Sequence, residues 1–143
     1  MTLEEARCFF ADDLFAMEQG IQIDEVDETS AACSVQLAPR HKNARGAAQG
    51  GLLYTLADFA FAVAANAGSF DTVTLNSNMH YLRAVAEGRV RAKATQTSRS
   101  RNTCVYKVQL WDDADTLVAE ASITGFGRPA PGTAPDKTSD AKA

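Results

Sequence analysis

The chain has 143 residues, of which 45% are hydrophobic and 22% charged, as is typical of one globular domain with a sizeable core. Its 14 basic and 18 acidic residues give a formal net charge of -4, so no broad basic surface is available for nucleic-acid binding. The three cysteines, Cys8, Cys33 and Cys104, lack C-x-x-C spacing. They are therefore expected to be buried, reduced thiols of a cytoplasmic protein, without a metal site.

Residues 1–20 predict a peripheral amphipathic helix. Thr2 can cap it, with Glu5 three residues later, and apolar residues recur at helical spacing until Gly20. Acidic residues stand where a signal peptide would carry basic ones, so no targeting segment is expected.

Alternation of apolar and polar residues predicts six strands, two before and four after a long apolar helix. The strands are expected at residues 21–26, 30–37, 72–82, 89–98, 103–111 and 117–126. Short turns between consecutive strands imply an antiparallel sheet with the helix packed on it, which is the α+β class. We expect one domain over residues 1–128 and a disordered tail over 129–143, where hydrophobic residues are scarce.

The long apolar segment from Gly46 to Phe70 contains a single charged side chain, Asp58. A central Asp costs about 2.5–3.5 kcal/mol in membrane insertion, so we expect a buried helix and no membrane span. The residues that share a helix face with Asp58 are mostly small or polar, which would let a ligand or a second helix approach. Asp58 is therefore a candidate functional residue. The alternative is a structural acid that is hydrogen-bonded to Thr55 or to a backbone amide.

The residues around this helix form a recognisable pattern. It reads His41-x-Asn43-x-x-Gly46-x-x-Gln49-Gly50-Gly51, followed by Leu56-Ala57-Asp58, with LNSNMHYLRAVAEG further along the chain. The pattern resembles the signature of hotdog-fold acyl-CoA thioesterases of the phenylacetyl-CoA thioesterase (PaaI) type, over residues 39–127. The resemblance implies a curved antiparallel sheet of five to six strands wrapped around one long helix, and homodimers that often pair into homotetramers.

The resemblance also implies roles for individual residues. Asp58 would be the general base or the nucleophile, and the Gly50 amide would hold the thioester oxygen at the helix N-terminus. Asn43 would orient the water or the thioester, and Thr74 would help to position the water. Gln49 departs from the family, which usually has a histidine there. It can still donate and accept hydrogen bonds near the carbonyl, but it cannot titrate.

The expected substrate is an acyl-CoA, in which coenzyme A is part of the substrate and no separate cofactor is required. Arg83, Arg99 and Arg101 are candidate ligands of the CoA phosphates, and the alternative is that they are solvated turn charges. Tyr54 and Gly51 lie on the helix face expected to meet the substrate, and the aromatic side chain suggests an aryl or medium-chain acyl group.

The spacing of two candidate residues supports a prediction that does not depend on the resemblance to a family. Gly50 and Asp58 are eight residues apart, so their backbones lie about 12 Å apart along one helix. One carbonyl group cannot contact both. If both act on one thioester, they come from different chains, and the active sites lie at a dimer interface.

Two other functions are compatible with the sequence. A dehydratase or hydratase that acts on acyl thioesters would require His80 or His41 close to Asp58. A non-catalytic acyl-CoA-binding protein is favoured by Gln49 and opposed by the presence of Asp58.

Overall fold

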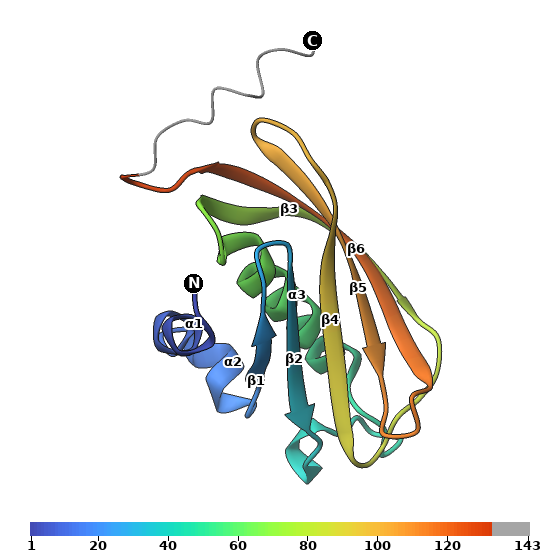
Figure 1. Cartoon of the computed structure of the whole chain (residues 1–143). Helices are drawn as coiled ribbons and strands as arrows, with labels where there is room; N and C mark the ends of the chain where they lie inside the picture. Colours follow the sequence, from blue (N-terminus) through green and yellow to red (C-terminus); the bar gives the residue numbers. More distant parts are fainter. Residues whose placement is uncertain (133–143) are drawn as a thin grey trace.

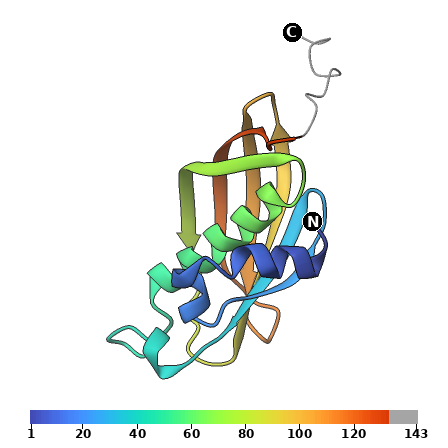
Figure 2. The same ribbon diagram turned by 90° about the vertical axis from the view of Figure 1, so that its left-hand side faces the viewer.

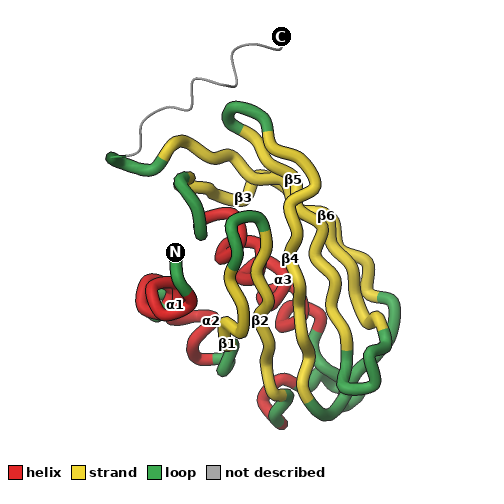
Figure 3. Tube along the Cα trace, viewed as in Figure 1, coloured by secondary structure: helices red, strands yellow, loops and turns green. Residues whose placement is uncertain are grey.

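The computed structural model describes residues 1–132, so most of the expected tail, residues 133–143, lies outside the described part of the chain. The elements are α1 (Leu3–Phe10), α2 (Leu14–Glu18), β1 (Gln22–Val26), β2 (Ser30–Gln36), η1 (Pro39–His41), α3 (Gly50–Asn66), β3 (Phe70–Tyr81), β4 (Arg89–Arg99), β5 (Thr103–Trp111) and β6 (Leu117–Pro129). All six strands lie where alternation predicted them (Figure 3), and the last extends through Pro129, past the expected domain boundary.

The six strands form one antiparallel sheet in the order β1-β2-β4-β5-β6-β3. The predicted α+β class is confirmed. β3 and β4 are consecutive in the chain but do not pair, because β3 joins β6 at the edge and β4 lies between β2 and β5. The connection over residues 82–88 therefore crosses the end of the sheet where α3 begins (Figure 1).

The sheet curves around α3, which lies against its concave face (Figure 2). The apolar face of the helix is buried, and it consists of Leu52, Leu53, Leu56, Phe59, Ala60 and Val63. The inward side chains of the strands complete this core, among them Val35, Val90, Val108, Leu110 and Ile123. Burial of this apolar surface, more than helix propensity alone, keeps α3 in place.

The expected single helix over residues 1–20 is wrong, because the chain forms two helices with a break between Phe10 and Leu14. The Asp13 side chain accepts a hydrogen bond from the Ala16 amide and so caps a new helix. The predicted capping box of Thr2 and Glu5 is present. Both helices lie on the same side of the sheet as α3, near β1 (Figure 2), and the Phe10 ring meets the Phe59 ring edge-on at 5.6 Å.

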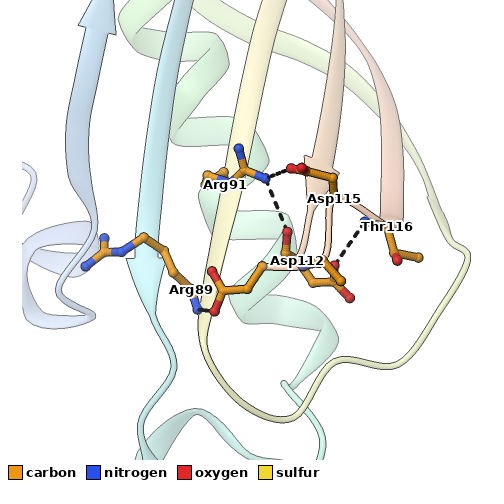
Figure 4. Close-up of polar contacts among 7 residues, drawn as sticks. Arg89, Arg91, Asp112, Asp115 and Thr116 are labelled. Atoms are coloured by element: carbon orange, nitrogen blue, oxygen red, sulfur yellow. Dashed lines mark hydrogen bonds and ion pairs between the residues drawn. The ribbon is translucent and has the colours of Figure 1, made fainter.

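The β5–β6 turn packs against the start of β4 (Figure 4). Arg91 donates to the Asp115 carboxylate and to the Asp112 carbonyl, and the Arg89 amide donates to Asp113 Oδ2 at 3.0 Å. Gly88 has a φ of +84°, and a Cβ there would lie 2.1 Å from the same oxygen. The turn therefore fixes the end of the 82–88 connection, and glycine at its last position avoids both the backbone strain and the collision with Asp113.

The cysteine prediction is partly wrong, because Cys33 and Cys104 are buried whereas Cys8 is exposed on α1. Burial raises the pKa of the Cys33 thiol well above its usual range.

None of the helices within residues 1–132 has the length and apolar character needed to cross a bilayer. Over the same residues no three His, Cys, Asp or Glu side chains come together as possible metal ligands.

Candidate active site

Gln49 organises the N-terminus of α3. The first four amides of a helix lack acceptors within it. Here the Gln49 carbonyl accepts from the amides of Leu52 (2.9 Å) and Leu53 (3.4 Å), and the Gln49 side-chain oxygen accepts from the Gly51 amide. Among residues 1–132, the Gly50 amide has no acceptor. It is thus a free donor at the positive end of the helix dipole.

Asn43 shapes the loop before α3. Its Oδ1 accepts from the amides of Arg45 (2.9 Å) and Ala47 (3.2 Å), while its backbone amide donates to the Ala47 carbonyl. This arrangement is an Asx turn that closes the loop on itself. The side-chain nitrogen is not needed to hold the turn, so the exposed carboxamide has donors available for a ligand.

Asp58 lies half-buried in the middle of α3 and faces away from the core. Its Oδ1 accepts a hydrogen bond of 2.9 Å from the hydroxyl of Thr74 on β3. The expected alternative partner, Thr55, instead donates to the Gly51 carbonyl at 2.7 Å. Two of the predicted site residues, Asp58 and Thr74, are therefore in direct contact, and the carboxylate keeps its second oxygen for other partners.

β3 runs alongside the exposed face of α3 in the opposite direction. Thr74 meets Asp58 near the middle of the helix, and the Tyr81 hydroxyl donates to the Gly50 carbonyl at its start, at 3.1 Å. Burial raises the pKa of the Tyr81 phenol, with Tyr54 adding to the shift, so the hydroxyl stays a donor at neutral pH.

Three of these residues, together with Arg83, line one hollow of about 310 Å³ at the start of α3. It is bounded by Asn43, Gly50, Tyr81 and Arg83, with apolar walls from Leu53 and Val85. The connection that carries Arg83 is held firmly, because the amides of Leu82 and Arg83 both donate to the Val118 carbonyl and Ala48 donates to Val85. Arg83 is exposed and forms no ion pair with any side chain in the described part of the chain.

The solvent-facing side of α3 consists of Gly51, Tyr54, Thr55, Asp58 and Ala62. Phe61 and Ala65, which helical spacing also placed beside Asp58, are buried instead. The outer edge of β3 borders this face and has no partner strand among residues 1–132. Val73, Leu75 and Tyr81 on β3 are more than half exposed, at 60%, 59% and 53%. An unpaired strand edge that carries exposed apolar side chains is a surface that proteins normally cover.

The three candidate phosphate ligands do not lie together within one chain. Arg83 is at the end of the sheet where α3 begins, whereas Arg99 and Arg101 belong to the β4–β5 end, where α3 finishes (Figure 1). The Arg99 guanidinium lies 3.9 Å from the centre of the Phe70 ring, and its Nε donates to Gln96 Oε1 at 3.2 Å. Arg99 therefore has a packing role at that end of the sheet.

Neither histidine is placed to share proton transfer with Asp58. His41 is buried at 2% exposure in the turn before the Asn43 loop, where its Nδ1 accepts from the Ala38 amide at 3.0 Å. His80 is next to Tyr81 on β3, and since Tyr81 turns toward α3, His80 faces the opposite side of the sheet. Within residues 1–132 of one chain, neither histidine therefore pairs with Asp58 as a dehydratase would require.

Tyr81 was not predicted as a site residue. It stands in the LNSNMHYLRAVAEG segment at the end of an alternating strand, but neither pattern shows that the strand runs past the helix N-terminus. The basic residues just before α3, Arg40, Lys42 and Arg45, form a charge cluster in the sequence, and Arg40 and Lys42 line a second hollow together with Gln49 and Gly51.

Comparison with known proteins agrees with this geometry. The model of the thioesterase superfamily matches residues 46–127. Acyl-coenzyme A thioesterase PaaI of Escherichia coli is 27% identical over 117 residues, covering 81% of this chain and 84% of that protein. The structure of E. coli PaaI superposes with a TM-score of 0.82 at 26% identity, covering 86% of this chain and 90% of the other.

Two further solved structures are similar. A mutant of the phenylacetic acid degradation protein PaaI from Thermus thermophilus has a TM-score of 0.75 and 34% identity, covering 80% of this chain and 98% of the other. A hypothetical thioesterase from Streptococcus pneumoniae, solved with coenzyme A, has a TM-score of 0.79 and 25% identity over 85% of this chain and 98% of the other. These likenesses confirm the predicted hotdog fold.

Proposed function

Because the chain belongs to the thioesterase superfamily and is a PaaI-type thioester hydrolase, we propose that it cleaves acyl-coenzyme A to the free acid and CoA. The observation that carries this proposal is the arrangement along one exposed face of α3. It offers a free amide donor at Gly50 and a carboxylate at Asp58 that is hydrogen-bonded to Thr74.

In the proposed reaction, Asp58 acts as general base. Its free oxygen takes a proton from a water molecule whose oxygen attacks the thioester carbonyl carbon. Negative charge develops on the carbonyl oxygen, where the Gly50 amide and the helix dipole stabilise it. The C–S bond then breaks, and the proton passes from Asp58 to the departing CoA thiolate. Thr74 holds the carboxylate in one orientation throughout.

The site is proposed to form between two copies of the chain. Gly50 and Asp58 both lie on the unbroken helix α3, eight residues apart, so a single thioester cannot reach both within one chain. The unpaired edge of β3 and the solvent-facing side of α3 are the surface on which a second copy would dock. A two-fold axis there would bring each Gly50 opposite the partner's Asp58, giving two sites per dimer. Pairing of two such dimers into a tetramer remains a further prediction.

The hollow at the start of α3 is the proposed entry for the CoA arm. Arg83 stands at its rim and is free to bind phosphate, and Asn43 offers its carboxamide to the pantetheine or the thioester. The acyl group would lie along the exposed face of α3, where Gly51 leaves space and Tyr54 supplies an apolar wall suited to an aryl or medium-chain group.

Thiol release from a panel of aryl- and alkyl-CoA thioesters tests the proposal. The wild type should release CoA from at least one class, and Asp58→Asn should lower kcat by about 10²–10⁴-fold while leaving the melting temperature unchanged. Asp12→Asn, at an exposed aspartate between α1 and α2, is the matched control. Binding without thiol release would favour an acyl-CoA-binding protein instead.

A further inference from the structure

A hollow of about 550 Å³ lies on the convex face of the sheet, which is turned away from α3. Residues of β1, β2, β4 and β5 line it, and these four strands are neighbours in the sheet. On β4, Arg89, Arg91 and Lys93 alternate with residues that are buried toward α3, so their side chains belong to the convex face. Neighbouring strands lie about 4.8 Å apart, so the hollow spans about 14 Å across the sheet. None of the residues of the proposed active site lines it.

The three cations of β4 differ in their partners. Lys93 Nζ lies 3.3 Å from a carboxylate oxygen of Glu25, and Arg91 is paired with Asp115 on the β5–β6 turn. Figure 4 shows the Arg91 side chain turned toward that turn, whereas the Arg89 side chain extends the other way, across β2. Of the three, only Arg89 has no ion pair within residues 1–132. Its positive charge is therefore available to a ligand.

A buried serine holds the Arg89 guanidinium in place. Arg89 Nη1 donates to Ser34 Oγ at 2.8 Å, and Ser34, on β2, is only 1% exposed. This is the only hydrogen bond of the Arg89 side chain to the described residues, so its other N–H groups remain free donors. A guanidinium that is fixed in this way presents a planar pair of donors, which matches the two oxygens of a carboxylate.

Trp111 supplies an aromatic surface to the same hollow. It is the only tryptophan in the chain and lies half-buried on β5, where it is paired in register with Arg91. An indole ring packs favourably against another aromatic ring. The hollow thus has an aromatic wall on β5 and a cation that reaches over β2, with the width of β4 between them. A ligand that uses both needs a ring and an anionic group joined by a short spacer.

The charge of the other lining residues selects the anion. Asp24, on β1, also lines the hollow and has no cationic partner among residues 1–132. A carboxylate carries one negative charge and so balances the single unpaired guanidinium of Arg89. Phosphate is largely a dianion at neutral pH, and Asp24 would repel it more strongly.

We propose that this groove on the convex face binds an aromatic monocarboxylate, with the carboxylate on Arg89 and the ring against Trp111. Ser34 acts as a positioning residue that orients the guanidinium. The groove and Asp58 lie on opposite faces of the sheet, so this inference does not depend on the proposed reaction.

Titration of the wild type with phenylpropionate, followed by tryptophan fluorescence, tests the site. Because Trp111 is the only tryptophan, the signal reports on this groove rather than on the active site. We expect a saturable change. Phenylpropionamide has the same ring and length without the charge, and butyrate has the charge without the ring. Each should bind at least about tenfold more weakly than phenylpropionate, and inorganic phosphate should not compete with it.

Variants assign the binding to individual side chains. Arg89→Gln should weaken phenylpropionate binding about tenfold or more, with an unchanged melting temperature and kcat. Ser34→Ala should weaken it about threefold, because the guanidinium loses the partner that orients it. Arg128→Gln is the matched control, since it removes an exposed arginine from β6, and it should bind as wild type. Asp58→Asn should also bind as wild type.

Equal affinity of wild type and Arg89→Gln would overturn the proposal, as would equal binding of the acid and its amide. If acrylamide does not quench Trp111 and phenylpropionate gives no response, the face is a contact between copies of the chain, and the proposal is also overturned. A saturable titration that is lost in Arg89→Gln would support the groove even if the wild type released no thiol from any acyl-CoA. The failure of the proposed function would thus be distinguished from the failure of this inference.

Discussion

Thr74 on β3 and Asp58 on α3 are joined by a hydrogen bond of 2.9 Å in which the hydroxyl donates to one carboxylate oxygen. The bond crosses from the edge strand to the central helix at the exposed face of both. It leaves the second carboxylate oxygen free and fixes its direction. A general base gains from such restraint because proton transfer depends on geometry as well as on basicity.

Replacing Thr74 by valine keeps the shape of the side chain and removes the hydroxyl. We expect kcat to fall about tenfold, because the Asp58 carboxylate loses the donor that orients it. Thr74→Ser retains the hydroxyl and should keep most of the wild-type kcat. Steady-state thiol release measures both variants. If valine and serine give the same rate, the hydrogen bond has no part in catalysis.

Complementation between two inactive variants tests the shared site. One chain carries Asp58→Ala and the other Asn43→Ala, and the two are coexpressed. A mixed dimer has one site with both residues intact, so random pairing should recover about a quarter of the wild-type activity. Each variant alone should remain inactive. If the coexpressed pair is as inactive as its parents, Asn43 and Asp58 serve the same site from one chain.

Most of the fold was predictable because the apolar side chains that a strand or helix buries recur at regular intervals along the sequence. The alternation of apolar and polar residues located all six strands, and a long apolar segment with one charged residue located α3. Alternation shows which side of a strand is buried but not which strand is its neighbour, so the pairing of β3 with β6 was not apparent. The break before α2 was missed because Asp13 could equally stand on the exposed face of a longer helix.

The candidate site was only partly predictable. Asp58, Gly50 and Asn43 could be named as candidates because each belongs to a local pattern around the start of α3. The contact between Tyr81 and Gly50 spans 31 residues and exists because β3 runs back along the helix. The separation of Arg83 from Arg101 has the same origin, since the path of β3 and β4 decides which end of the sheet each turn occupies.

Charge reversal at Arg83 tests the proposed position of the CoA phosphates. Arg83→Glu should raise KM for acyl-CoA about tenfold or more, because an attractive contact with phosphate becomes repulsive. KM for the matching N-acetylcysteamine thioester, which has no phosphates, should not change. Arg101→Glu lies at the other end of the sheet and serves as the comparison. A larger effect at Arg101 than at Arg83 would place the phosphates at the β4–β5 end instead.

The close contact at Gly88 predicts a loss of stability on substitution. Gly88→Ala should lower the free energy of unfolding by about 2–3 kcal/mol, because a Cβ is strained at a φ of +84° and collides with Asp113. Gly46 has a φ of +82° with nothing within 4 Å of its missing Cβ, so Gly46→Ala carries the backbone strain alone and should cost about 1 kcal/mol. Urea denaturation compares the two. Equal losses would show that Asp113 moves aside freely.

Buried His41 predicts that stability depends on pH. Burial lowers the pKa of His41, and the charge of Arg40 lowers it further. The folded protein therefore resists protonation that the unfolded chain accepts near about pH 6.5. As the pH falls below that value, the unfolded state binds more protons and the free energy of unfolding decreases. His41→Asn can keep an acceptor for the Ala38 amide but does not titrate, so its stability should vary less between about pH 7 and 5. His80→Gln, at an exposed position on β3, should retain the wild-type slope; an equal flattening in both variants would contradict the assignment to His41.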